Sequence, residues 1–189
     1  MALPDVSVDR EHIHTRKVIC DGYKRSDGLW DIEARLTDTK TYDFPNKDRG
    51  GHIFAGDAIH HMCLRLTLDL DFVIHAIDVI SVDTPFHICK SASDSMQSLV
   101  GLQIKTGWMR EVRARIGNKA GCTHLVELLG PLATTAYQTM HEALIARDLQ
   151  QAEPQQPKII NTCVALAADG PVVAREWPEF YTGDSLNID

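Results

Sequence analysis

The first part of the chain alternates between apolar and polar residues. From Trp30 to Leu36 every second residue is apolar, and the residues between them are charged. A period of two is typical of a strand with one buried face. The segment 16–22 carries Val18 and Cys20 at alternate positions, and residues 25–28 have the composition of a tight turn. We therefore expect an N-terminal β-hairpin.

Two further alternating runs follow the hairpin. Apolar residues occupy alternate positions from Met62 to Leu68, and a turn at 69–71 leads into a third run at 73–82. These runs predict an antiparallel meander. Between the hairpin and the meander, the segment 42–58 is rich in glycine. We expect it to form a long functional loop, such as a lid over a site.

The spacing of apolar residues changes to that of helices after residue 89. A short helix is expected to begin at Ser91 or Ser93 and to end before Gly101. A second helix is expected over 108–116. The longest helix is expected to begin near residue 121, and Pro131 inside it should kink or split it.

The order of these elements predicts the fold class. Strands followed by helices favour an α+β fold, with an antiparallel sheet of hairpin and meander and with helices packed on one face. We expect one such domain over residues 1–150. Residues 151–189 contain a polar, proline-containing segment and two short apolar runs. We expect them to form a C-terminal arm, as a hairpin or an extended segment, that packs on the same domain or on a partner subunit in a homodimer.

The composition argues against several classes of protein. The 189 residues include 19 Lys and Arg against 26 Asp and Glu, which gives a formal net charge of −7. An acidic chain lacks the basic footprint that nucleic-acid binding needs. No apolar run approaches the ~18 residues of a membrane-spanning helix, and the first residues do not resemble a secretory signal. We expect a cytoplasmic protein that acts on a small molecule, without nucleic-acid or membrane partners.

Five cysteines are spread along the chain without a CxxC pair. In a reducing compartment such cysteines are buried thiols, metal ligands or nucleophiles. Cys89 and Cys122 fall at the expected starts of helices, where the helix dipole stabilises a thiolate. We expect these two residues to be the metal ligands if zinc or iron is bound. The alternative is that both are small buried apolar residues.

A second group of candidate residues includes the exit of the long loop. Asp57 and His60 lie there, and His60 can face the helix layer once the strand has begun. His124 lies two residues after Cys122, so on a regular helix these two side chains point apart. We expect Asp57, His60 and His124 to act as bases, ligands or polarising groups. The alternative is that the histidines are solvated, or are hydrogen-bonded at a helix start.

Charged residues on the polar face of the hairpin form a mixed array that continues to Asp38. Arg65 extends such a face on the next strand, and we expect it to act in catalysis by anchoring a substrate anion. Trp30, Glu33 and Arg113 are expected to bind the substrate. The alternative is that these charges only face solvent.

Three motifs, RSDGLWDIEARLTDTK, HHMCLRLTLD and GCTHLVELLGPLATTAYQ, together resemble a bacterial protein family of unknown function. The order of segments from about residue 54 to 138 also resembles the fold of iron–sulfur cluster scaffold (NifU-like) proteins. This second resemblance implies ligand positions at Asp57, Cys89 and Cys122. Ala55 and Gly121 stand where those scaffolds have a cysteine and a histidine, so the chain departs from the pattern at two positions.

These observations lead to hypotheses about function. The first is a small-molecule catabolic enzyme of lyase or hydrolase type, which works by acid–base or metal-assisted chemistry on a small aromatic or acyl compound. The second is a metal- or iron–sulfur-carrying scaffold without catalysis, and the third is an interaction module whose cysteines are only buried. No glycine-rich phosphate loop, nucleophile elbow or HExxH motif is present, so we expect no nucleotide cofactor.

Overall fold

The computed structural model describes residues 3–5, 7–150 and 155–183. The chain divides into two compact units, residues 1–143 and 144–189, and the boundary falls inside the longest helix. We describe each unit separately.

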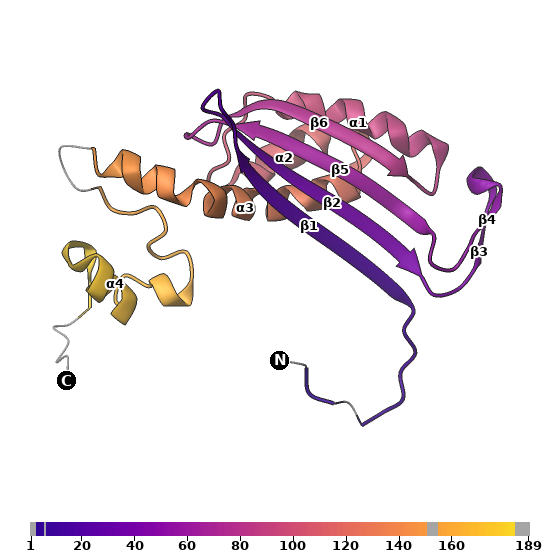
Figure 1. Ribbon diagram of the computed structural model, residues 1–189, viewed down its shortest axis with the longest axis horizontal. Helices are drawn as coiled ribbons and strands as arrows, with labels where there is room; N and C mark the ends of the chain where they lie inside the picture. The colour runs from indigo at the N-terminus through magenta and orange to yellow at the C-terminus, as the bar shows by residue number, and fades with distance from the viewer. Residues whose placement is uncertain (1–2, 6, 151–154, 184–189) are drawn as a thin grey trace. The chain divides into compact units, whose positions relative to one another are not determined.

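A four-stranded antiparallel sheet forms the centre of the first unit (Figure 1). Its strands are β1 (His14–Lys24), β2 (Trp30–Lys40), β5 (Ala58–Leu68) and β6 (Ile74–Asp83), in the order β1-β2-β5-β6. Helices of the same unit lie on one face of this sheet. The structure therefore confirms the expected α+β fold, whereas the resemblance to iron–sulfur scaffolds is not confirmed.

The β1–β2 hairpin forms where the alternation predicts it. Its register is unbroken from the pair His14 and Lys40 to the pair Lys24 and Trp30. The turn is closed by the Arg25 N–H, which donates to the carbonyl of Leu29, and Gly28 adopts a positive φ of 87°.

The segment expected to be a loop contains a small hairpin of its own. It consists of β3 (Phe44–Asn46), the 3-10 turn η1 (Lys47–Arg49) and β4 (Gly51–Ile53). The Arg49 guanidinium attaches it to the main sheet by donating to the carbonyls of Ala58 and Thr84. The segment is therefore ordered and attached to the sheet.

The helices follow the sheet in the chain. In order they are η2 (His87–Ser91), α1 (Ala92–Ser95), η3 (Met96–Leu99), α2 (Trp108–Ile116), η4 (Asn118–Ala120) and α3 (Thr123–Asp148). The single short helix expected before Gly101 is a series of 3-10 and α turns. Pro131 does not split α3, which runs through it as one element.

The core of the first unit lies between the sheet and these helices. Along β2 the even-numbered residues from Trp30 to Leu36 are buried, and helices cover one face of this sheet. Helix α3 passes very close to β1, because a Cβ atom added at Gly22 would lie 1.8 Å from the hydroxyl oxygen of Thr139. Glycine is therefore required at this point of β1.

Besides the end of α3, the regular elements in the described part of the second unit are short helices. This part contains η5 (Val164–Leu166), α4 (Pro171–Glu176) and η6 (Pro178–Phe180), around a small core of Ile160, Ala168 and Val173. The expectation of a hairpin or extended arm was therefore wrong for this part. Gly170 and Pro171 explain the difference, because proline at the first helical position starts a helix. Within the described residues, no helix combines the length and apolar character needed to cross a bilayer.

Candidate functional site

A buried carboxylate interrupts the apolar face of β2. The alternation that buries Leu36 continues to Asp38, whose side chain is only 2% exposed. Across the sheet, Asp38 lies opposite Arg16 of β1 on one side and His60 of β5 on the other. Beyond this row the register of β5 slips, so that Thr39 faces Ala58. Such bulges re-aim side chains near the end of a strand.

The carboxylate of Asp38 accepts hydrogen bonds from Arg16 and His60 and lies close to His14. The Arg16 guanidinium donates from Nε to Oδ1 at 2.7 Å and from Nη2 to Oδ2 at 2.8 Å. His60 Nδ1 lies 2.9 Å from Oδ2, and His14 Nε2 lies 3.3 Å from Oδ1. A carboxylate in this position needs such partners, because burying an unpaired charge is costly.

The start of α3 brings a second imidazole to the same place. The ring centroid of His124 lies 3.7 Å from that of His60, and its Nε2 lies 3.9 Å from Asp38 Oδ2. Glu127, one turn later, accepts a hydrogen bond from Nη1 of Arg16. We refer to Arg16, Asp38, His60 and His124 as the Asp38 cluster.

The pKa values of the cluster are shifted in directions that follow from its geometry. Burial lowers the pKa of His60 below its ordinary value of 6.5, and the neighbouring His124 lowers it further, although Asp38 acts in the opposite direction. Burial and the charge of Arg16 lower the pKa of His124. For Asp38, burial raises the pKa but the hydrogen bond and charge of Arg16 outweigh it, so the pKa is lowered.

These shifts fix the protonation state at neutral pH. Asp38 is ionised and can only accept hydrogen bonds, so the proton on His60 sits on Nδ1. The Nε2 atom of His60 then carries a lone pair. The cluster therefore combines an ionised carboxylate, a guanidinium and two neutral imidazoles, which is a set of groups suited to proton transfer.

The same donor atoms could hold a metal ion. Asp38, His60 and His124 each offer one ligand atom, and these three atoms lie within 4.8 Å of one another. Two imidazoles and one carboxylate are a donor set that suits zinc or non-haem iron. However, both carboxylate oxygens of Asp38 already accept hydrogen bonds from the positively charged Arg16.

Cys122 lies at the margin of this cluster. Cys122 precedes Thr123, the first residue of α3. The angle that separates residues two apart on a regular helix therefore does not apply to Cys122 and His124. Its Sγ lies 3.9 Å from Nδ1 of His124, and the residue is half-buried. The structure thus brings together three of the residues named from the sequence, namely His60, His124 and Cys122.

Two other expected ligands lie outside the cluster. Asp57 is exposed in the turn before β5, and Cys89 lies in η2. The segment of Cys89 is attached to the β3–β4 hairpin, since the backbone N–H of His87 donates to Asp48. Among the described residues, Asp57, Cys89 and Cys122 do not form a group that could share one metal ion.

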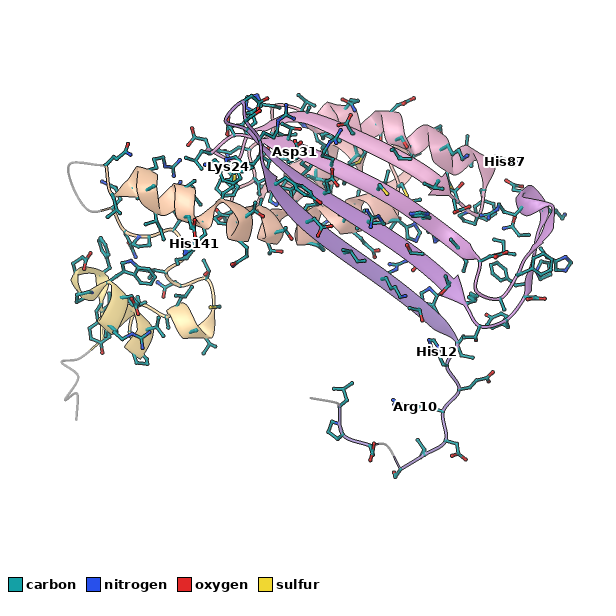
Figure 2. All side chains as sticks on the ribbon, in the orientation of Figure 1. Arg10, His12, Lys24, Asp31, His87 and His141 are labelled. Carbon is teal, nitrogen blue, oxygen red and sulfur yellow. The ribbon has the colours of Figure 1, made fainter. Side chains whose placement is uncertain are left out.

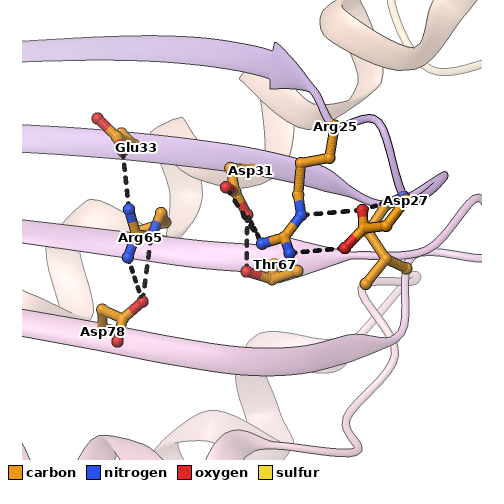
Figure 3. A network of polar contacts seen from close by, with 8 residues as sticks. Arg25, Asp27, Asp31, Glu33, Arg65, Thr67 and Asp78 are labelled. Carbon is orange, nitrogen blue, oxygen red and sulfur yellow. Dashed lines mark hydrogen bonds and ion pairs between the residues drawn. The ribbon is translucent and has the colours of Figure 1, made fainter.

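Arg65 and Glu33 lie on the opposite face of the sheet, which the helices leave open. Figure 3 shows Arg65 between Glu33 and Asp78, with its nitrogens 3.5 Å and 2.7 Å from their carboxylate oxygens. These three residues help to line a shallow hollow of about 180 Å³. The helix-covered cluster and this open-face network are therefore separate groups.

Of the remaining expected substrate-binding residues, Trp30 lies apart from the cluster. Trp30 is buried at the start of β2, with the Lys24 ammonium 5.6 Å from its ring centroid, and Arg113 is exposed on α2. Figure 2 labels Lys24 and Asp31 at the β1–β2 turn and His12 at the other end of β1. Asp38 lies near the end of β2, so Trp30 and the Asp38 cluster occupy opposite ends of this strand.

Sequence reasoning missed Arg16 and missed the role of Asp38. Asp38 was grouped with the solvent-facing charges, although the period of two places it on the same face as Leu36. An acidic residue on an apolar face was the signal that could have identified it. Arg16 then follows from the hairpin register, which sets it opposite Asp38.

Comparisons with known proteins identify the family without indicating its chemistry. Searches of curated proteins and of solved structures returned no match. A family model described as a protein of unknown function, DUF2889, matches residues 14–138. This range spans all four strands of the main sheet, all of α1 and α2, and most of α3, so it contains the whole Asp38 cluster. The chain belongs to the DUF2889 family of proteins of unknown function.

Proposed function

We propose that this chain is an enzyme of lyase or hydrolase type that uses the Asp38 cluster for acid–base chemistry on a small molecule. The observation that carries the proposal is the 2.9 Å contact between buried Asp38 and His60, with the ring of His124 beside it. A structural ion pair would need only Arg16 and Asp38. The lowered pKa values of the two imidazoles keep both rings uncharged at neutral pH, so each ring has a nitrogen lone pair that can accept a proton during a reaction.

His60 is the general base in this proposal. Asp38 holds its ring by Nδ1, as the carboxylate of a catalytic triad holds its histidine. The Nε2 lone pair is then free to accept a proton from water, in a hydrolase, or from a substrate C–H group, in a lyase. Once His60 is protonated, the charge of Asp38 stabilises the imidazolium.

His124 limits the cluster to one extra proton at a time. Two imidazolium rings whose centroids are 3.7 Å apart would repel each other, so protonation of one keeps the other neutral. A proton taken up by His60 is therefore easily released to a leaving group. His124 remains a neutral imidazole that can accept or donate a hydrogen bond to the substrate.

The substrate class in this proposal is the one that the sequence suggested, a small aromatic or acyl compound. Leu36, Met62 and Leu125 are buried, and each lies within two residues of a member of the cluster. Because all three are buried, they belong to the core next to the cluster and are not open to a substrate. All five cysteines are unpaired thiols, which supports a reducing, cytoplasmic setting.

A second candidate is the metal-assisted form of the same chemistry. The three donor atoms within 4.8 Å of one another favour it. Zinc or iron held by Asp38, His60 and His124 would supply a Lewis acid or a bound water of lowered pKa. We place this candidate second because the charge of Arg16, bonded to both oxygens of Asp38, opposes a cation.

The proposal can be tested with a panel of short-chain and aromatic esters and thioesters for hydrolysis, and of aromatic hydroxy compounds for elimination. Any activity found is then measured in His60→Ala and in Asp38→Asn. Removing a general base typically lowers kcat by ~10²–10⁴-fold, and we expect a loss in this range for His60→Ala.

His75→Ala is the matched control. His75 also contacts a carboxylate, with Nε2 2.7 Å from Asp69, but it is 46% exposed and lies outside the cluster. We expect this variant to keep the activity. An activity that survives both His60→Ala and Asp38→Asn would contradict the proposal.

A further inference from the structure

Strand β1 is a long edge of the sheet with a free side. It pairs with β2 alone, through eleven consecutive residue pairs without a bulge. Figure 1 shows it at the margin of the sheet. Within the described residues, no backbone hydrogen bond connects β1 to any segment other than β2. Alternate N–H and C=O groups of β1 therefore point outward along its length.

Such an edge is normally protected against pairing with another chain. Proteins use prolines, bulges, very short strands or isolated charges for this purpose. Strand β1 has eleven residues and contains neither proline nor a bulge. It also exposes apolar side chains: Val18 is 42% exposed, Ile19 49% and Tyr23 50%.

The charges of β1 are arranged symmetrically about Ile19. Lys17 lies two residues before it and Asp21 two residues after it, and all three face the open side of the sheet. Within the part of the chain that the structure describes, neither Lys17 nor Asp21 forms an ion pair. Asp21 instead lies directly opposite another acidic residue, Glu33 of β2. Like charges in this arrangement repel each other.

We propose that β1 pairs with β1 of a second copy of this chain, antiparallel and about a two-fold axis at Ile19. In this register Lys17 lies opposite Asp21 of the second copy, and the symmetry forms the same pair twice. Ile19 lies opposite Ile19 of the second copy. The two sheets become one continuous sheet of eight strands, and the helices of both copies stay on the same face.

The charges select this register over its neighbours. An axis at Lys17 or at Asp21 would place two like charges directly opposite each other. An axis at Cys20 would set Arg16 opposite Lys24. An axis at Val18 would not bring any two oppositely charged residues of β1 opposite each other. The ion pair of Lys17 and Asp21 also neutralises the lysine that would otherwise protect the edge.

The test is sedimentation equilibrium of the full chain over a range of concentrations in reducing buffer. The wild-type protein should be a dimer in equilibrium with monomer. Lys17→Glu sets a carboxylate opposite Asp21 in both symmetric pairs, and we expect the dimer dissociation constant to rise about tenfold or more. Asp21→Lys should weaken the dimer to a similar extent.

The double variant with Lys17→Asp and Asp21→Lys exchanges the two charges and should restore the dimer. Lys119→Glu, on the exposed turn η4, changes the net charge by the same amount as Lys17→Glu and should leave the dimer intact. Circular dichroism verifies that each variant is folded. A wild-type protein that stays monomeric at its highest soluble concentration overturns the proposal. So does a dimer that is insensitive to both single variants, or a double variant that does not recover.

Discussion

The buried carboxylate of Asp38 provides the sharpest test of the site. Asp38→Asn keeps the shape of the side chain but removes its charge. The amide oxygen can still accept hydrogen bonds from the donors on its side, whereas the amide nitrogen would face donors. The change therefore weakens the contacts to Arg16 and to His60 together.

The expected loss can be worked out from the contacts. Hydrogen bonds to charged groups contribute ~1.5–3 kcal/mol each, and breaking a fully buried ion pair costs ~3–5 kcal/mol. Arg16 is 35% exposed and keeps Glu127, so the full penalty does not apply. We expect the free energy of unfolding to fall by about 2–3 kcal/mol.

Urea denaturation followed by circular dichroism measures this loss. Asp27→Asn is the matched control, because Arg25 binds Asp27 with the same two-bond geometry but on the surface. Exposed pairs contribute little, so the control should change stability far less. Equal losses in the two variants would refute the argument that burial of Asp38 makes its contacts important.

Three further predictions follow from other features of the structure. The lowered pKa of His60 and of His124 means that the folded protein binds fewer protons than the unfolded chain below pH 6.5. Stability should therefore be full above pH 6.5 and fall as the pH drops towards the folded pKa values, and thermal melts of His60→Ala should show a smaller fall. The lowered pKa of Asp38 causes a separate loss of stability, which begins only when the pH falls below 3.8, the ordinary pKa of this carboxyl group. Gly22→Ala should lower the free energy of unfolding by about 1–3 kcal/mol, because the added Cβ would lie 1.8 Å from the hydroxyl oxygen of Thr139. Urea denaturation measures this loss, and a variant as stable as wild type would show that α3 packs differently. Treatment with a chelator should leave any activity unchanged, and a loss that zinc or iron reverses would favour the metal-assisted form.

Much of the first unit could be predicted from the sequence, because local pattern determines it. The alternation from Trp30 to Leu36 and the turn at Gly28 define the hairpin without knowledge of the rest of the chain. The spacing of Trp108, Val112 and Ile116 predicted α2 with its observed bounds. These elements have a regular period and clear end signals.

The site was harder to predict because it joins elements that are distant in the chain. His60 and His124 are brought together only by the packing of α3 on the sheet, which no local pattern encodes. Asp38 could be recognised only by following the strand face one step beyond its last apolar residue. Asp57 and Cys89 were proposed from residue type and order alone, and the fold places them outside the cluster.

The central claim is that Asp38 holds His60 as a neutral base with its proton on Nδ1. Nuclear magnetic resonance of ¹⁵N-labelled histidine side chains, recorded as a pH titration, measures both the tautomer and the pKa, and His60→Ala assigns the signals. The account predicts that His60 carries its proton on Nδ1 at neutral pH and titrates below its ordinary value of 6.5. A proton on Nε2, or a pKa at or above 6.5, would contradict it.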